Sequence, residues 1–346
     1  MFNYKNAFKR NLGWITKEEQ EKLKNATIAI GGLGGVGGVH LETLTRLGVA
    51  NFHIADLDIF DYSNFNRQVG ANVETVGKSK ISVALAEMKK INPDIKITLF
   101  DQGVNEDNIN EFLDGVDLYV DSLDIFAIEA RKLVFRSCHK KEIPAITAAP
   151  MAMGVSFLCF SKDSMSFDDY FGLKDLDQSV LNSLEEKEKS LYILKTYADN
   201  VVSFIGGVAP KAYQRHYIVD VTTVDLFKKD LPSLKMGIDL AAGALCSNAL
   251  KLLLGRGEVI RAPRSFHFDS YLNKYSKPWR PFGHKNPLQS ILRLIIKKKI
   301  KLNDKLQKIE ADIRNDVITL PENTSEKDLY EVLSNLTSKL ELTKVS

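Results

Sequence analysis

A cluster of glycines between an apolar run and a helical pattern constrains this chain more than any other feature. Residues 27–30 are a short apolar run typical of a buried strand, and residues 36–47 repeat apolar side chains at helical spacing up to Gly48. Glycines at such a junction let the backbone turn sharply and approach a phosphate, which then meets free helix N–H groups and the positive end of the helix dipole. The sequence therefore predicts a strand–loop–helix phosphate site that contains Gly32, Gly34, Gly35 and Gly37.

Strand and helix patterns continue to alternate through the first two-thirds of the chain. Further strand candidates are residues 51–55, 95–100, 118–120 and 145–147, and helical patterns cover residues 78–91, 106–113 and 124–139. Alternation of this kind implies right-handed crossovers. We expect an α/β protein with a Rossmann-like, doubly wound, mostly parallel sheet, a C-terminal antiparallel extension at residues 259–269 and a helical tail.

The chain of 346 residues is long enough for one large domain with additions. We expect a domain over residues 1–285, with a nucleotide-binding half at 1–160 and a variable crossover and acceptor region at 161–285. Small-residue segments such as Phe204–Pro210 fit either packing turns or a groove for a glycine-rich peptide. Residues 286–346 are expected to be a helical C-terminal appendage.

The appendage begins with a basic amphipathic pattern. Residues 288–302 combine aliphatic side chains with one arginine and four lysines, and the pattern predicts a basic amphipathic helix that extends to about Arg314. Such a helix can lie on an anionic membrane or in a partner's groove. Packing of its apolar face on the protein's own body is the expectation that we favour, and membrane-surface contact is the alternative.

Charge and cysteine content exclude several classes of protein. With 47 Lys and Arg against 44 Asp and Glu, the net charge of +3 is too small to indicate a DNA-binding surface. Cys138, Cys159 and Cys246 are widely separated in apolar stretches, a pattern typical of reduced, buried thiols in a cytoplasmic protein. Every apolar stretch is interrupted short of the ~20 residues that a membrane-spanning helix needs.

Charged residues beyond the second strand narrow the choice of nucleotide. Asp56 and Asp58 follow that strand, where a carboxylate can accept hydrogen bonds from both ribose hydroxyls, and NAD is the natural first candidate. Arg67 and Lys80 come next, and a dehydrogenase has no use for them. A triphosphate does, since each cation offsets phosphate charge. ATP is therefore the expected ligand.

Taken together, these motifs resemble the ThiF/MoeB/HesA adenylyltransferases, which are relatives of ubiquitin-activating enzymes. The resemblance covers about residues 8–269 and rests on the motifs Gly-Leu-Gly-Gly-Val-Gly, Asp-x-Asp, Ser-Asn-x-Asn-Arg-Gln, the lysine after Val-Gly, and Ile-Asn-Pro. It implies adenylation of a carboxylate by ATP with release of pyrophosphate. The carboxylate is usually the C-terminal glycine of a ubiquitin-like or sulfur-carrier protein, while a peptide or small-molecule acceptor is the other option.

The resemblance also implies roles for individual residues. Ribose binding falls to Asp56 and phosphate binding to Arg67 and Lys80, and Asn64 and Asn66 would line the same pocket. The position of Asp124 matches the residue that places Mg²⁺ and the α-phosphate. Arg10 matches an arginine that reaches across a homodimer interface to the partner's ATP.

The sequence departs from the family in three ways. It has no CxxC pair, so we expect no structural zinc. Residues 161–235 contain no cysteine, so we expect the reaction to stop at the acyl-adenylate or pass it directly to another nucleophile. The family's Asp-Asn-x-x-x-Arg is altered, because Ile125 follows Asp124 and the arginine is displaced by two positions to Arg131.

Three alternative functions stay open on the sequence alone. A related subgroup without the catalytic cysteine dehydrates threonylcarbamoyladenosine on tRNA, although no pronounced basic face for tRNA is legible here. The altered Asp124 region also fits a non-catalytic nucleotide-binding or scaffold protein. An NAD-dependent oxidoreductase is disfavoured by Arg67 and Lys80.

Overall fold

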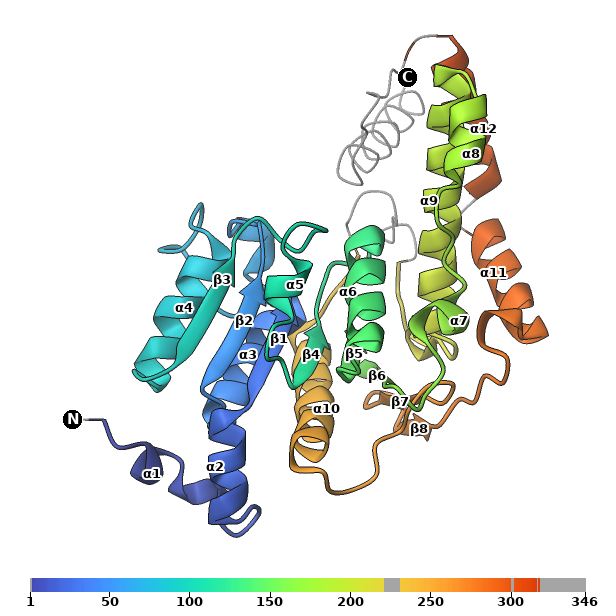
Figure 1. The fold of residues 1–346 in the computed structure, drawn as a ribbon. Coiled ribbons are helices and arrows are strands. Elements are labelled where there is room, and N and C mark those ends of the chain that lie inside the picture. The colour runs from blue at the N-terminus through green and yellow to red at the C-terminus, as the bar shows by residue number, and fades with distance from the viewer. Residues whose placement is uncertain (1, 221–230, 300–301, 316, 318–346) are drawn as a thin grey trace.

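The computed structural model describes residues 2–220, 231–299, 302–315 and 317, and its centre is an eight-stranded sheet (Figure 1). The strand order is β3-β2-β1-β4-β5-β6-β7-β8, in which the first five positions pair in parallel and the remainder in antiparallel fashion. The strands are β1 Thr27–Gly31, β2 Asn51–Ala55, β3 Lys96–Phe100, β4 Leu118–Asp121, β5 Ala145–Pro150, β6 Gly154–Phe160, β7 Phe266–Asp269 and β8 Lys274–Ser276. The expected Rossmann-like sheet with an antiparallel extension is confirmed.

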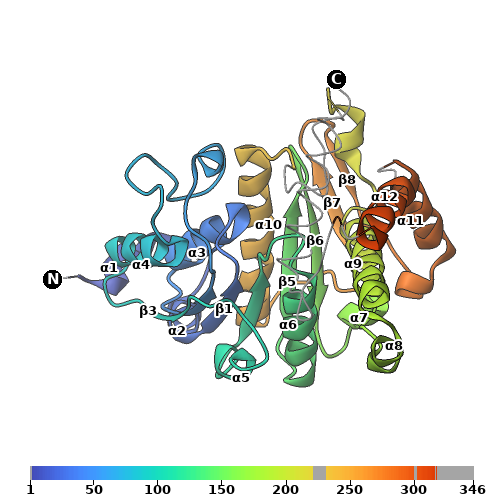
Figure 2. The same ribbon diagram turned by 90° about the horizontal axis from the view of Figure 1, so that it is seen from above.

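Helices cover both faces of this sheet (Figure 2). They are α1 Tyr4–Ala7, α2 Lys17–Asn25, α3 Gly35–Leu47, α4 Lys80–Ile91, α5 Ile109–Phe112, α6 Ile128–Lys140, α7 Phe167–Phe171, α8 Gln178–Ser183, α9 Glu186–Val208, α10 Lys235–Leu254, α11 Pro287–Lys299 and α12 Leu302–Arg314. One apolar core joins α2, α3, α4 and α10 to the sheet, and a second joins α5, α6, α7, α9 and α12. Each face of the sheet is therefore buried, as a parallel sheet requires.

One described helix, α10, is long and apolar enough to cross a membrane by length and composition. The expectation that every apolar stretch falls short of that length is therefore wrong for this segment. Half of its most apolar window is buried inside the fold. Ala241, Leu245 and Ala249 belong to the core shared with α3 and the sheet, so the apolarity of α10 is that of a central packing helix.

Three predicted elements differ from the structure. Helix α6 begins at Ile128 rather than Asp124, because residues 124–127 form a turn in which Asp124 Oδ1 accepts the Phe126 N–H at 3.0 Å. Residues 204–208 are helical and end α9; Gly207 lies so close to Phe171 that a Cβ there would be 2.2 Å from the ring. The basic helix of the appendage is two helices, α11 and α12. Most of the tail, residues 318–346, lies outside the described residues.

Candidate functional site

The candidate site lies at the carboxyl ends of β1, β2 and β4. Gly31 at the end of β1 pairs in register with Ala55 of β2 on one side and with Asp121 of β4 on the other. The chain proceeds from β1 outward to β2 and β3 and then returns to β4, so the strand order reverses between β1 and β4. Open α/β sheets bind their ligands in the crevice at such a reversal.

The glycine loop is closely packed at two positions and open at a third. Gly32 has φ +88°, and a Cβ there would lie 2.4 Å from the Ser122 carbonyl oxygen. A Cβ at Gly37 would lie 1.9 Å from the Gly32 carbonyl oxygen, so these two positions require glycine. At Gly34, which precedes the first turn of α3, a Cβ would meet nothing within 4 Å. The N-terminus of α3 is therefore open to an approaching anion.

Asp56 connects this loop to the end of β2. Its Oδ2 accepts the Leu33 N–H at 2.6 Å, and its Oδ1 accepts the Asp58 N–H at 2.8 Å. Burial raises the pKa of Asp56 above its ordinary value, and the two backbone N–H groups oppose that rise. A carboxylate oxygen has a second lone pair, so both oxygens retain the capacity to accept a ribose hydroxyl.

Lys80 is a buried cation placed where the helix dipole does not favour one. It is the first residue of α4, and only 5% of it is exposed. Its Nζ lies 3.1 Å from Oδ2 of Asp58, whose side chain is 59% exposed. Positive charge is favoured at the C-terminus of a helix rather than at its N-terminus. The helix dipole therefore does not account for the position of Lys80, whose charge is paired with Asp58.

Arg67 lies beside the N-terminus of α3. Its Cδ would be 3.8 Å from a Cβ at Gly35, and its Nη1 donates to the Ser63 carbonyl oxygen at 2.8 Å and to Asn66 Oδ1 at 2.9 Å. These contacts fix the guanidinium next to the open end of α3. Arg67 and the glycine loop, which were expected to act on the same phosphates, are therefore adjacent.

The two asparagines differ in their surroundings. Asn64 is buried, and its Oδ1 accepts the Asp61 N–H at 3.0 Å, which holds the short 3-10 turn Tyr62–Asn64 that leads to Arg67. Asn66 is exposed and donates to the Ser233 carbonyl oxygen at 2.9 Å. Asn64 thus supports the backbone of the site, and Asn66 connects it to the segment that precedes α10.

Asp124 occupies the loop that follows β4, and Arg131 holds that loop in place. Asp124 is exposed, and Arg131 is buried with its Nη1 3.1 Å from the Asp124 carbonyl oxygen and its Nη2 2.6 Å from that of Leu123. The Nε of Arg131 lies 3.0 Å from Oδ2 of Asp121, in an ion pair whose side chains are 3% and 1% exposed. Because α6 begins late, the displaced arginine of the sequence motif still reaches back to the loop.

Sequence reasoning gave no role to two residues beneath the site. His40 of α3 is fully buried, and its Nδ1 lies 2.9 Å from Oγ of Ser122, the residue that contacts Gly32. Burial lowers the pKa of His40 to about 3, so the ring is neutral at physiological pH. The sequence signal that could have identified His40 is a polar residue at an apolar position of the predicted helix. The corresponding signal for Asp121 is a carboxylate at the end of a buried strand.

Arg10 lies far from this site in its own chain. It belongs to the 3-10 turn Lys9–Asn11, which is attached to the opposite end of α3 through the Asn11 side chain and the Leu47 carbonyl oxygen at 3.0 Å. Helix α3 has 13 residues, and at ~1.5 Å per residue its two ends are about 20 Å apart. Arg10 therefore does not join the glycine loop of its own subunit.

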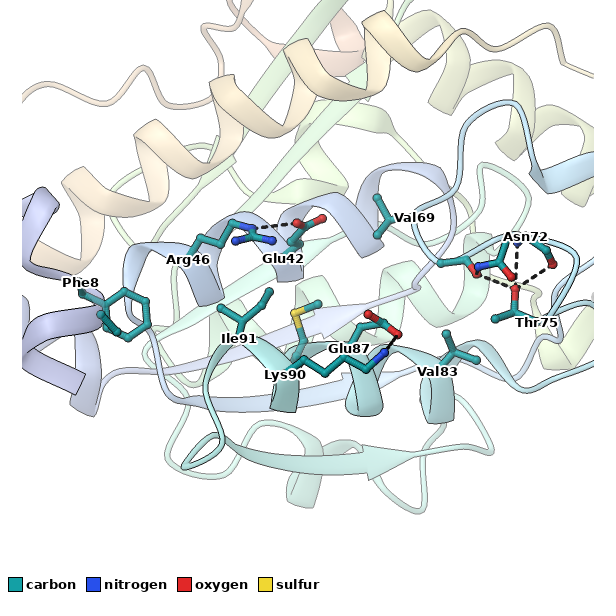
Figure 3. A pocket seen from close by; sticks show the side chains of 13 residues that line it. Phe8, Glu42, Arg46, Val69, Asn72, Thr75, Val83, Glu87, Lys90 and Ile91 are labelled. Atoms are coloured by element: carbon teal, nitrogen blue, oxygen red, sulfur yellow. Dashed lines mark hydrogen bonds and ion pairs between the residues drawn. The ribbon is translucent and has the colours of Figure 1, made fainter. Parts of the chain in front are cut away.

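A groove of about 780 Å³ runs between α3 and α4, and Figure 3 shows its lining. Phe8 lies at one end and the Val69–Thr75 loop at the other, with the ion pairs Glu42–Arg46 at 2.8 Å and Glu87–Lys90 at 2.6 Å along its walls. None of the residues expected to bind the nucleotide lines this groove. It is a separate feature on the flank of the site.

The three cysteines lie in the two cores. Cys138, Cys159 and Cys246 are buried and free, and burial raises the pKa of the Cys159 and Cys246 thiols to about 12. A thiol of that pKa is not a nucleophile at neutral pH. In the described ranges, no group of three or more His, Cys, Asp or Glu side chains could hold a metal ion.

Curated relatives match a little under half of the chain. The chain is 35% identical over 142 residues to the tRNA threonylcarbamoyladenosine dehydratase of Bacillus subtilis (strain 168), which is 41% of this chain and 55% of that protein. It is 30% identical over 168 residues to the molybdopterin-synthase adenylyltransferase of Haemophilus influenzae, covering 48% of this chain and 68% of the relative. The chain spans about half the length of the first of these relatives, 55%.

Solved structures share the fold over most of the chain. The crystal structure of E. coli MccB with MccA aligns with a TM-score of 0.56 at 19% identity, over 84% of this chain and 75% of that one. The crystal structure of PaaA aligns with a TM-score of 0.53 at 16% identity, over 75% and 66%. These likenesses concern the fold alone. The model of the ThiF family matches residues 8–290, and the chain belongs to the ThiF family.

Proposed function

We propose that the protein is an ATP-dependent adenylyltransferase that activates a carboxylate as an acyl-adenylate and releases pyrophosphate. The observation that carries this proposal is the position of Lys80, a buried lysine at a helix N-terminus that interacts with Asp56, the carboxylate bonded to the glycine loop. A nicotinamide cofactor would leave such a cation without a purpose. The names of relatives such as the molybdopterin-synthase adenylyltransferase support the same reaction class.

The reaction needs no nucleophilic side chain. A substrate carboxylate oxygen attacks the α-phosphorus, a new P–O bond forms, and the bond to the β-phosphate oxygen breaks as pyrophosphate leaves. Asp56 would hold the ribose, and Arg67 and Lys80 would hold the phosphates and offset the charge that develops on them. The N-terminus of α3 would add its free N–H groups to the same task.

Magnesium is the metal that this arrangement fits. Mg²⁺ is usually bound by one or two carboxylates together with phosphate oxygens and water. Asp124 is an exposed carboxylate on the β4–α6 loop next to the glycine loop, which is a donor of this kind. When bound, the ion would neutralise phosphate charge, and Arg131 would keep the Asp124 loop in position.

We propose that the acyl group passes directly from the adenylate to another nucleophile, without a thioester on this chain. Because burial raises the pKa values of the cysteine thiols, a thioester on this chain is disfavoured. We propose as acceptor the C-terminus of a ubiquitin-like or sulfur-carrier protein or of a peptide. We place the reaction in the cytoplasm, where three buried free thiols stay reduced.

A second candidate is supported by the dehydratase named among the relatives. In that reading the activated carboxylate belongs to a threonylcarbamoyl group on tRNA, and the same phosphate-binding residues serve it. The two candidates share the adenylation step and differ in the acceptor.

The test of the proposal measures ATP–pyrophosphate exchange with and without added acceptors. The acceptors are a carrier protein ending in Gly-Gly and tRNA that bears the threonylcarbamoyl group, and the nucleotide preference is read by thermal shift. ATP at a hundred times its dissociation constant is expected to add ~2.7 kcal/mol of stability, whereas NAD should add little. Stabilisation by NAD alone, with no exchange in any arm, would contradict the proposal.

We also propose a homodimer in which Arg10 acts on the partner's nucleotide, because Arg10 lies at the far end of α3 from its own glycine loop. Arg10→Ala and Arg67→Ala homodimers are each expected to be inactive. Mixing them should restore activity at about a quarter of all sites, since one of the two sites in each mixed dimer of a two-fold assembly is intact. Exchange activity of the refolded mixture is the measurement, and no recovery would exclude action across the interface.

A further inference from the structure

Helix α11 turns four of its apolar side chains away from the protein, whereas Ile296 packs inward against the core, beside Gly206 of α9. Leu288, Ile291, Leu294 and Ile295 are 75%, 52%, 67% and 48% exposed. Figures 1 and 2 both show α11 at the outer margin of the molecule, with α9 on its inner side. An amphipathic helix on a globular protein normally turns its apolar stripe toward the core.

Polar contacts hold α11 in this orientation. Arg293 Nη2 donates to the His284 carbonyl oxygen at 3.1 Å, and Lys297 Nζ lies 2.5 Å from Oδ1 of Asp199. Rolling the helix to bury its aliphatic side chains would break these contacts. The outward direction of the apolar side is therefore built into the sequence.

The neighbouring helix α12 has the ordinary arrangement. Leu302, Ile309 and Ile313 are 1%, 4% and 2% exposed and belong to the same core as α9. The appendage is thus able to bury an amphipathic helix on α9, and it does so with α12. The exposed stripe of α11 is not explained by a lack of core.

Charge indicates what covers the stripe. Residues 287–299 contain no carboxylate, whereas Lys298 and Lys299 are exposed at the end of the helix and Lys285 is exposed just before it. A second copy of the chain is a poor occupant, because whichever way two α11 helices were paired, the lysines of one would find no carboxylate on the other. An anionic surface complements this pattern.

We propose that the protein docks on an anionic lipid surface through the α11 face. This face is defined as Leu288, Ile291, Leu294 and Ile295 with Lys298 and Lys299. The aliphatic side chains enter the boundary between headgroups and acyl chains, and the lysines contact the headgroups. A basic helix whose apolar side is buried a few ångströms in a bilayer binds in this way. The proposal is independent of the adenylation chemistry.

The test uses the full chain and vesicles of phosphatidylcholine, with and without phosphatidylserine, in co-sedimentation. Binding is expected only with phosphatidylserine and is expected to weaken as salt is raised. The variant Ile291→Glu/Leu294→Glu should lower the partition coefficient at least tenfold. Lys298→Gln/Lys299→Gln should lower it by about fivefold per lysine.

Matched controls separate docking from net charge and from folding. Lys89→Gln/Lys96→Gln removes the same charge from exposed positions on α4 and β3 and should bind as the unaltered chain does. All the altered positions are exposed, although about half of Ile291 is covered. The free energy of unfolding should therefore change by no more than about 1 kcal/mol.

Three outcomes would overturn the proposal. One is equal binding by the Ile291→Glu/Leu294→Glu variant and the unaltered chain. Another is the absence of binding to phosphatidylserine vesicles at low salt. The third is a shift from dimer to monomer in sedimentation velocity caused by the same double variant, which would assign the α11 face to a second copy.

Discussion

Replacement of Lys80 or Arg67 by alanine is expected to lower the rate of ATP–pyrophosphate exchange by about a hundredfold to a thousandfold, because each removes a cation that offsets charge in the transition state. The fold should persist. The ion-pair partner of Lys80 is Asp58, whose side chain is 59% exposed and is rehydrated when the lysine is lost. Arg67 is only partly buried and its polar contacts are to its own turn.

Lys78→Ala is the matched control, since Lys78 is an exposed lysine two residues before Lys80. It should keep full exchange activity and full stabilisation by ATP. Circular dichroism and the thermal midpoint without nucleotide report on folding in all three variants. Exchange at the unaltered rate in Lys80→Ala would remove this residue from the mechanism, and the same result in Arg67→Ala would remove the arginine.

Arg131→Met is expected to lower the free energy of unfolding by about 3–5 kcal/mol, because it leaves the carboxylate of Asp121 buried without its partner. The two side chains are 3% and 1% exposed and lie 3.0 Å apart. Exchange activity should fall as well, since Arg131 also holds the carbonyl groups of Leu123 and Asp124. Urea denaturation at neutral pH measures the first effect.

Two further variants test the cause of that loss. Arg136→Met on the same helix removes an arginine whose side chain is 40% exposed and paired with Asp168 and Asp175, and it should cost less than about 1 kcal/mol. Adding Asp121→Asn to Arg131→Met should recover much of the lost stability, because the buried charge is then gone. Additive losses in the double variant would show that the ion pair is not the source of the effect.

The sequence predicts the nucleotide-binding half well because local rules decide it. The glycine loop, the ends of β1 and β2 and the start of α3 follow from periodicity and backbone freedom, and the structure places them within a residue or two. The position of Asp56 beside the glycine loop could be anticipated, since the carboxyl ends of parallel strands meet at one edge of a sheet.

The elements that sequence reasoning missed depend on tertiary packing. The late start of α6 depends on the Asp124 side chain, which bonds to the Phe126 N–H and forms a turn in place of a helical one. The helical segment at Gly206 and Gly207 packs against distant parts of the chain, Phe171 lying against Gly207 and Ile296 of α11 beside Gly206. The direction of the α11 stripe is set by Asp199 and His284, which a helical wheel of residues 287–299 cannot include.

The apolar character of α10 has a consequence for biosynthesis. Taken apart from its packing partners, this 20-residue helix has the length and composition of a membrane span. Its packing partners α3, β5 and β6 all precede it in the chain. Because folding during synthesis starts from the N-terminus, these partners are already synthesised when α10 emerges. The order of the elements along the chain thus allows α10 to pack on its partners as soon as it is synthesised, which shortens the time for which its apolar side chains are exposed.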